Sequence, residues 1–88
     1  MARYKVEVKR TAVKELNGIP HKDLKKVVSR IESLADNPRP RGCEKLSQSE
    51  RYRVKQGNYR ILYSIADDAM TVCVVKIGHR KDIYRTRP

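Results

Sequence analysis

The sequence predicts an α+β fold in which two helices pack on one face of a small curved sheet. Two observations support this prediction: one strongly amphipathic segment in the first half, and three apolar segments separated by tight turns in the second half. The expected order is a strand, two helices and a three-stranded antiparallel meander. With 88 residues the chain has room for one modest core, so we expect residues 1–88 to form a single domain.

The first half of the chain carries the signals for one strand and two helices. Polar and apolar side chains alternate over residues 3–8, which is typical of a strand. A short helix is expected over residues 11–17, and Gly18 suits its end. Pro20 fits the first turn of a second helix, which ends before Pro38 because the residue preceding a proline disfavours the helical conformation. The apolar residues of this second helix recur on one face, at Leu24, Val27, Val28, Ile31, Leu34 and Ala35.

The second half predicts three strands, at about residues 51–56, 59–66 and 70–77. Gly57-Asn58 and Asp67-Asp68 separate them, and both connections are short enough for antiparallel hairpins. The last of the three strands is apolar on both faces, as expected for a strand in the centre of a sheet.

Lysine and arginine outnumber aspartate and glutamate by 21 to 10, which gives a net charge of +11. Such an excess in a short chain favours a polyanionic partner, namely nucleic acid, an acidic protein or an anionic membrane. A solvated basic surface is the alternative. No apolar run approaches the roughly 20 residues that span a bilayer, and the N-terminal residues lack the apolar region of a signal peptide. We therefore expect a cytoplasmic protein with no membrane partner.

The cysteines and histidines indicate neither a disulfide nor a metal site. Cys43 and Cys73 lie in unlike contexts and form no CxxC pair, so we expect reduced thiols. His21 and His79 are far apart in the sequence and have no neighbouring cysteine, so no metal-ligand spacing is present. The sequence thus predicts no metal and no cofactor.

Cations gather on one face of the first predicted hairpin. Arg51, Arg53 and Lys55 share the face opposite to Val54, because successive side chains of a strand point to opposite faces. One register places Arg60 of the next strand beside them. Like charges opposite each other destabilise a sheet, so the cluster favours a site for an anion such as a phosphate backbone. The alternative is that the long stems cover a thin sheet while their charged ends reach water.

Three motifs in this region resemble the RelE branch of the RelE/ParE toxin superfamily. They are Tyr52-Arg53-Val54-Lys55, then Gly57-x-Tyr59-Arg60-Ile61-x-Tyr63, then Val75-x-Ile77-x-His79-Arg80-x-x-x-Tyr84. The preceding strand and helix pair fit the same layout, so the resemblance covers nearly the whole chain. It implies a RelE-like fold and an endoribonuclease (mRNA interferase), the toxin of a type II toxin–antitoxin system, which cleaves mRNA in the ribosomal A site. The implied reaction uses no metal: the 2′-hydroxyl of the RNA attacks the adjacent phosphate and leaves a 2′,3′-cyclic phosphate.

The resemblance also implies a role for each residue of a catalytic set. Arg53 and Lys55 match the basic pair that binds the phosphate and offsets its developing charge. Arg60 matches the arginine that contacts the scissile phosphate, and Arg80 matches the arginine that stabilises the transition state or the leaving oxygen. Tyr84 matches the C-terminal tyrosine that positions the nucleophile and can share in its deprotonation.

His79 stands where other members of the family carry lysine or histidine, and its role stays open. It is the only group of the set that titrates near neutrality, so it could be a general base; equally, it could stack on a base or cap the strand. Further RNA-binding side chains are expected at Lys45, Arg51, Lys76 and Lys81. On the second helix, a solvated face or a docking surface for ribosomal RNA is formed by Lys22, Lys25, Lys26 and Arg30.

The resemblance implies an acidic antitoxin as the protein partner, together with the ribosome and mRNA. It implies no direct DNA recognition by this chain, because the family usually represses its operon through the antitoxin. Three alternatives stay open at this point: a ParE-like inhibitor of DNA gyrase on the same scaffold, a non-catalytic basic RNA-binding domain, and an inactive toxin retained with its antitoxin.

Overall fold

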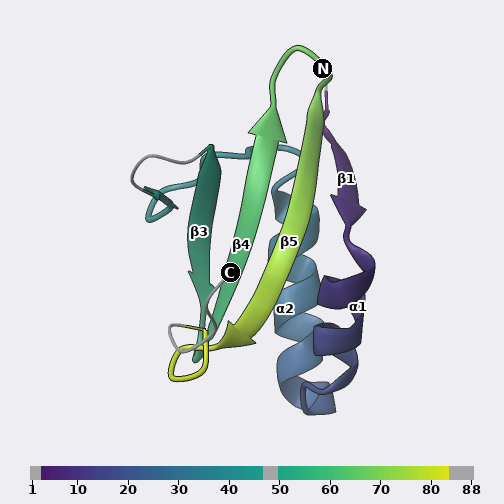
Figure 1. Ribbon diagram of the computed structural model, residues 1–88, viewed down its shortest axis with the longest axis vertical. Coiled ribbons are helices and arrows are strands. Elements are labelled where there is room, and N and C mark those ends of the chain that lie inside the picture. The colour runs from purple at the N-terminus through teal and green to yellow at the C-terminus, as the bar shows by residue number, and fades with distance from the viewer. Residues whose placement is uncertain (1–2, 47–49, 84–88) are drawn as a thin grey trace.

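A five-stranded sheet with the strand order β1-β5-β4-β3-β2 forms the centre of the molecule (Figure 1). The computed structural model describes residues 3–46 and 50–83. The elements are β1 (Lys5–Val8), α1 (Arg10–Asn17), α2 (His21–Ser33), β2 (Glu44–Lys45), β3 (Arg51–Gln56), β4 (Tyr59–Ala66) and β5 (Thr71–His79). The α+β prediction, with its strand, two helices and antiparallel meander, is confirmed.

The sheet is mixed rather than wholly antiparallel, because its first strand pairs in parallel with its last. Residues of β1 align with β5 from the Lys5–Thr71 pair to the Val8–Val74 pair. The two-residue strand β2 pairs only with the first half of β3. The crossover through α1 and α2 makes the parallel pairing possible, because parallel neighbours need a long connection.

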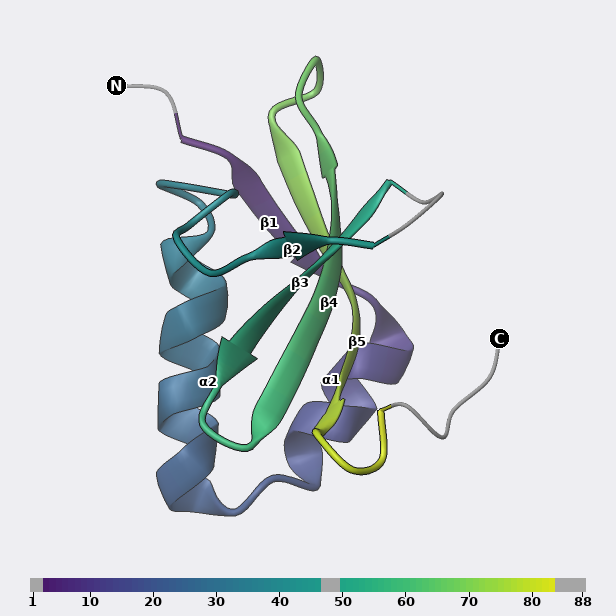
Figure 2. The same ribbon diagram turned by 90° about the vertical axis from the view of Figure 1, so that its left-hand side faces the viewer.

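The two helices lie on the same side of the molecule but contact different parts of the sheet. Figures 1 and 2 show α2 running across one face of the sheet, while α1 lies alongside β5. We call the face away from α2 the open face. The core lies between α2 and the sheet, where burying each large apolar side chain stabilises the fold by about 1.5–3 kcal/mol. Its largest fully buried side chains are Leu34, Val27, Val54, Ile61, Tyr63, Val72, Val74 and Ile77.

One extra residue in β5 changes which side chains reach the open face. Leu62 aligns with Lys76 whereas Tyr63 aligns with Val74, so Val75 has no partner on β4 and forms a bulge. A bulge reverses the alternation of every residue that follows it. Ile77 therefore returns to the helix-covered face and is buried there, as Val74 is before the bulge.

A carboxylate replaces a neighbouring strand along the second half of β5. Beyond Val74, the strand has no partner from β1. Glu15 of α1 occupies that position: one carboxylate oxygen accepts a 2.9 Å hydrogen bond from the backbone N–H of Ile77. Its other oxygen accepts one from Nζ of Lys76, at 3.1 Å. The helix thus satisfies a backbone donor that would otherwise lack a ladder partner.

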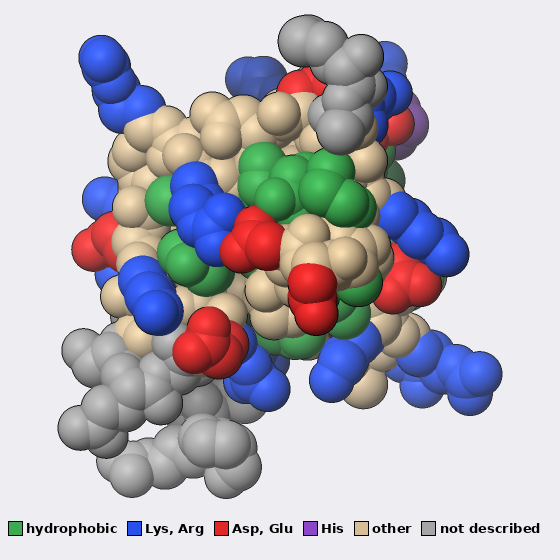
Figure 3. All heavy atoms as spheres, turned by 90° about the horizontal axis from the view of Figure 1, so that it is seen from above, with side chains coloured by type: hydrophobic (Ala, Val, Ile, Leu, Met, Phe, Trp, Pro, Cys, Tyr) green, Lys and Arg blue, Asp and Glu red, His purple; other side chains and the backbone are tan. Residues whose placement is uncertain are grey.

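At the end of the sheet that carries the β4–β5 turn, charged groups are paired with groups of opposite charge. Arg39 donates two hydrogen bonds, of 3.1 and 2.9 Å, to the carboxylate of Asp67. Its Nε also donates to the hydroxyl of Tyr52, and the Tyr4 hydroxyl donates to Asp67 at 2.7 Å. Figure 3 looks onto this end, where acidic and basic side chains lie next to one another. We call Arg39, Asp67, Tyr4 and Tyr52 the Arg39 network.

None of the described helices has the length and apolar character needed to cross a bilayer.

Candidate functional site

Lys55 and Arg60 lie directly opposite each other on the open face. The β3–β4 register pairs Lys55 with Arg60 and Arg53 with Leu62, so the three cations share one face, as the sequence predicted. Side chains paired in this way have Cβ atoms about 4.5–5.5 Å apart. Gly57, with φ of 59°, allows the two-residue turn that fixes this register. We call Arg53, Lys55 and Arg60 the cation cluster.

The guanidinium of Arg60 is held by the turn beside it. One terminal nitrogen donates to the carbonyl oxygens of Gly57 and Tyr59, at 3.1 and 3.0 Å. Its Nε is buried and has no hydrogen-bond partner among the described residues. Lys55, by contrast, is exposed, and the described residues supply no ion pair for its amino group. Within the cluster, Arg60 is thus held by the turn and Lys55 is exposed, and both can bind an added anion.

Arg53 makes an ion pair with Glu44, a residue that the sequence analysis did not single out. Its guanidinium lies 2.8 Å from a carboxylate oxygen of Glu44, and the two residues pair directly between β2 and β3. The Arg53 side chain is 18% exposed and that of Glu44 is 53% exposed. The hydrogen bond from Arg53 lowers the pKa of Glu44, and the charges of Lys55 and Arg60 lower it further. Glu44 is thus an ionised carboxylate within the field of the whole cluster.

The chain after β5 folds back over the open face. Gly78 pairs with Arg60 and shares that face. Ile83 is buried directly above it: a Cβ atom placed on Gly78 would lie 3.5 Å from Cβ of Ile83. A small hollow of about 190 Å³ beside Ile83 is lined by Leu46, Arg53, Leu62 and Ile83. Ile83 thus lies on the face that carries the cation cluster.

His79 and Arg80 lie at the end of β5, as predicted, but His79 does not face the cluster. It pairs with Tyr59, and the two rings meet edge to face with centroids 5.8 Å apart. Tyr59 packs against the core, so this pairing puts His79 on the helix-covered face. Its Nδ1 accepts a hydrogen bond from the backbone N–H of Lys81. Arg80 is exposed, and its backbone N–H donates to the carbonyl of Asn58 at 2.7 Å.

The other predicted RNA-binding residues are dispersed. Arg51 is exposed, and its pairing with Ser64 places it on the open face. Lys45 pairs with Tyr52 and therefore belongs to the opposite face from Arg53. Lys76 binds Glu15, as described above. Lys81 is exposed in the turn after β5, and Tyr84 lies outside the described residues.

Two residues of this site escaped the sequence analysis for identifiable reasons. Glu44 belongs to a strand of two residues that follows a loop rich in proline and glycine, so no alternation predicted its pairing. A charge pattern could have pointed to it. Glu50 and Glu44 are the two acidic residues that most closely precede the cluster in sequence. Ile83 lies beyond the last predicted strand, and only a long-range contact identifies its position.

The arrangement can bind and stabilise an oxyanion, and it offers no evident metal site. Several cations on a rigid hairpin can compensate charge that develops on phosphate oxygens. Within residues 3–46 and 50–83, no group of three His, Cys, Asp or Glu side chains could hold a metal ion. Both cysteines are free thiols.

Known proteins share both the sequence pattern and the fold. A family model described as the ParE toxin of the type II toxin–antitoxin system parDE matches residues 6–84. The chain is 31% identical over 87 residues to the putative toxin RelE1 of Methanocaldococcus jannaschii, which covers 94% of this chain and 97% of that protein.

Solved structures of toxins of the same type share the fold of this chain. The toxin–antitoxin complex RelBE2 of Mycobacterium tuberculosis matches with a TM-score of 0.81 and 30% identity, over 91% of this chain and 94% of that one. The archaeal RelE–RelB complex of Pyrococcus horikoshii matches with a TM-score of 0.79 and 25% identity, over 88% and 94% of the two chains. The chain therefore belongs to the RelE/ParE superfamily, the toxins of type II toxin–antitoxin systems.

Proposed function

We propose that this toxin is a ribosome-dependent endoribonuclease, which cuts mRNA in the ribosomal A site in the cytoplasm without a metal ion. The observation that carries the proposal is the cross-strand pair of Lys55 and Arg60, with Arg53 beside it on the same face. A hairpin that sets like charges opposite each other loses about 0.2–1 kcal/mol for the pair, and a bound phosphate would reverse that cost. The relative named RelE1 adds support from an independent direction.

The proposed reaction is an attack of the RNA 2′-hydroxyl on the adjacent phosphate. The 2′-hydroxyl loses its proton to solvent as its oxygen bonds to phosphorus. The bond to the 5′-oxygen breaks, that oxygen takes up a proton from solvent, and the products carry a 2′,3′-cyclic phosphate and a 5′-hydroxyl. Arg60 and Lys55 bind the phosphate oxygens on which charge develops, with Arg53 beside them. Arg80 stabilises the negative charge that develops on the leaving oxygen, and Tyr84 positions the nucleophile. The nucleophile is part of the substrate, so alignment and charge stabilisation are the main tasks of the protein.

Neither His79 nor Glu44 is required by this proposal as a general base. His79 points to the helix-covered face, so we assign it a structural role at the end of β5. Glu44 competes with the substrate for Arg53, and it is displaced when a phosphate binds. The surrounding ribosome supplies the alignment that so open a site lacks.

Primer extension on a translated mRNA tests this function, with and without ribosomes. Wild-type chain should produce cuts within codons only when ribosomes are present. Arg80→Ala should abolish them, whereas Arg41→Ala, which removes an exposed arginine of the loop before β2, should not. Intact mRNA under translation with wild-type chain would sink the nuclease proposal.

Gyrase inhibition is the second candidate, and the match to a family model described as a ParE toxin favours it. The activity would then depend on a protein contact and not on the cation cluster. A supercoiling assay with purified DNA gyrase distinguishes the two: inhibition that survives Arg60→Gln would favour the gyrase candidate.

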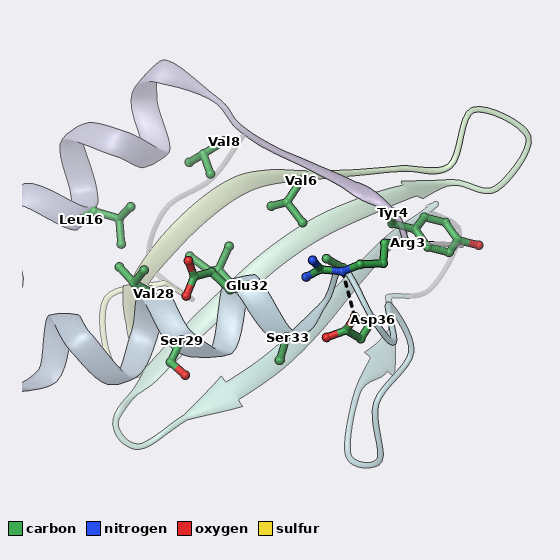
Figure 4. Close-up of a pocket in the computed structure, with 12 residues that line it drawn as sticks. Arg3, Tyr4, Val6, Val8, Leu16, Val28, Ser29, Glu32, Ser33 and Asp36 are labelled. Atoms are coloured by element: carbon green, nitrogen blue, oxygen red, sulfur yellow. Dashed lines mark ion pairs between the residues drawn. The ribbon is translucent and has the colours of Figure 1, made fainter. Parts of the chain in front are cut away.

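We further propose that an antitoxin binds the groove beside β1. This groove, of about 850 Å³, lies between β1, α1 and α2 (Figure 4). Val6, Val8, Leu16 and Val28 point into it, and the Arg3–Asp36 ion pair of 2.9 Å lies at one end. Its lining is mostly apolar, as the docking surface of an amphipathic helix should be. The M. tuberculosis and P. horikoshii neighbours were both solved as complexes with an antitoxin.

Val28→Lys tests the antitoxin site, because it places a charge in the groove from the half-buried outer side of α2. Antitoxin affinity should fall by at least tenfold while RNA cleavage is kept. The matched control is Val13→Lys, at a valine that is 41% exposed and does not line the groove. Equal losses for both variants would contradict this location.

A further inference from the structure

A second groove, between α2 and the end of β3, differs in character from the apolar groove beside β1. It has a volume of about 390 Å³. Every side chain that lines it is a cation or carries a hydrogen-bond donor, and none is acidic or apolar. They are Lys25, Lys26, Ser29, Arg30, Ser33 and Gln56. We call this the α2 groove; in Figure 2 the end of β3 lies beside α2.

The β3 edge is accessible at the α2 groove. Among the described residues β2 pairs only with Arg53 and Tyr52, so no strand covers β3 at Gln56. Gln56 is also the residue after Lys55, and neighbouring residues of a strand point to opposite faces. The α2 groove and the cation cluster therefore lie on the two sides of the same strand end.

Arg30 supplies the guanidinium among the residues that line the α2 groove. Its side chain is half-buried, and its Nε is buried with no hydrogen-bond partner in the described part of the chain. A guanidinium that lines a groove together with two lysines and two serines matches the oxygens of a phosphate.

A continuous path connects the α2 groove to the cation cluster. An adjoining hollow of about 180 Å³ shares Lys26 and Gln56 with it and extends along Gly57, Asn58 and Tyr59. The carbonyl of Gly57 in turn binds the guanidinium of Arg60. Asp23 also lines this hollow, so a strand crossing it would place sugars and bases there, and phosphates in the α2 groove.

We propose that the α2 groove binds backbone phosphates of the same RNA strand on which the cation cluster acts. The inference rests on the proposed function, because it extends the RNA site of that proposal around the end of β3. RNA is favoured over a protein segment because the lining has no apolar side chain to anchor a helix, whereas the groove beside β1 has several. The path to Arg60 favours the substrate strand over ribosomal RNA.

Lys26→Glu and Lys22→Glu form the matched pair that tests this proposal. Both lysines are exposed on α2 and both changes alter the net charge equally, but only Lys26 lines the groove. The probe is a fluorescent single-stranded RNA of about twelve nucleotides, a length within the usual site sizes, with 2′-O-methyl groups that prevent cleavage. We expect Lys26→Glu to weaken binding about tenfold and Lys22→Glu by less than twofold.

Salt dependence gives a second readout on neutral variants. Lys26→Gln should reduce the slope of log affinity against log salt by about 0.7, the value for one phosphate contact with a single strand, and Lys22→Gln should leave it unchanged. Unfolding midpoints of all four variants should match wild type, which separates lost contacts from lost structure.

Three other outcomes overturn the proposal, each in a recognisable way. If both charge reversals weaken RNA binding equally, binding depends on the net charge of the chain and not on the groove. Unchanged oligonucleotide binding, with ribosome-dependent cleavage lost only in Lys26→Glu, would assign the groove to ribosomal RNA. Loss of antitoxin binding alone would assign it to an acidic protein segment. If wild type cuts no RNA but the matched pair still differs in binding, the nuclease proposal fails and the groove remains an RNA site.

Discussion

The arginines at the two ends of the sheet have opposite kinds of neighbour. At the β4–β5 end, Arg39 has a carboxylate and a phenol as partners, and its guanidinium lies over the Tyr52 ring, 5.3 Å from the centroid. At the β3–β4 end, Arg60 faces Lys55 and binds only carbonyl oxygens among the described residues. Satisfied charges stabilise a fold, whereas gathered like charges cost stability and attract a ligand. The difference separates a structural end from the end at which we propose the RNA site.

Exchanging the two arginines for glutamine gives the largest expected contrast. Arg60→Gln should reduce RNA cleavage about 100-fold, as loss of one donor to a developing oxyanion does, with little change in the unfolding midpoint. Arg39→Gln should do the reverse, lowering the midpoint while cleavage is kept. Ribosome-dependent primer extension and thermal unfolding of both variants measure this contrast. It breaks down if Arg60→Gln unfolds the chain or Arg39→Gln abolishes cleavage.

Tyr63→Phe should produce the largest loss of stability from a single atom. The buried hydroxyl of Tyr63 donates a 2.7 Å hydrogen bond to the carbonyl of Pro38, at the structural end of the sheet. Removing it leaves a buried acceptor unsatisfied, at a cost of about 1–3 kcal/mol. The midpoint should fall by about 4–8 °C for each kcal/mol, by calorimetry. Tyr59→Phe, whose hydroxyl has no hydrogen bond among the described residues, serves as the control and should be near neutral.

Lys55→Gln should stabilise the chain slightly and weaken its activity. It removes the like charge opposite Arg60, which is worth about 0.2–1 kcal/mol. Urea unfolding should therefore show a higher midpoint at low salt, with the gain reduced at high salt by screening. RNA cleavage should fall about tenfold in the same variant. A decrease in stability would show that Lys55 has a structural partner after all.

The smallest expected effect is a pH dependence at the structural end. Hydrogen bonds from Arg39, and then from Tyr4, hold the pKa of Asp67 at about 2, below its ordinary value of 3.8. An acid with a lowered pKa contributes stability that is complete above the ordinary pKa and lost as pH falls through the lowered one. The difference in midpoint between wild type and Asp67→Asn should therefore close between about pH 4 and pH 2. A difference that persists unchanged at pH 2 would contradict this role.

Much of the hairpin could be predicted, because its signals are local. A two-residue turn with Gly57 fixes the register, and the register alone brings Lys55 opposite Arg60. The Arg39 network could not be predicted in this way, since Tyr4, Arg39 and Asp67 lie far apart in the sequence. The orientation of His79 depends on the bulge at Val75, and an apolar run with no alternation gives no sign of an extra residue. The parallel pairing of β1 with β5 likewise joins segments far apart in the sequence, so no local signal predicts it.

The carboxylate of Glu15 also affects how this chain behaves in a crowded cell. An uncovered strand edge is a template for self-association, because any other extended chain can add to it. By binding the N–H of Ile77, Glu15 occupies a backbone donor that an added strand would need, without the need for another strand. A partner that adds a strand must choose a different edge or first displace a helix side chain.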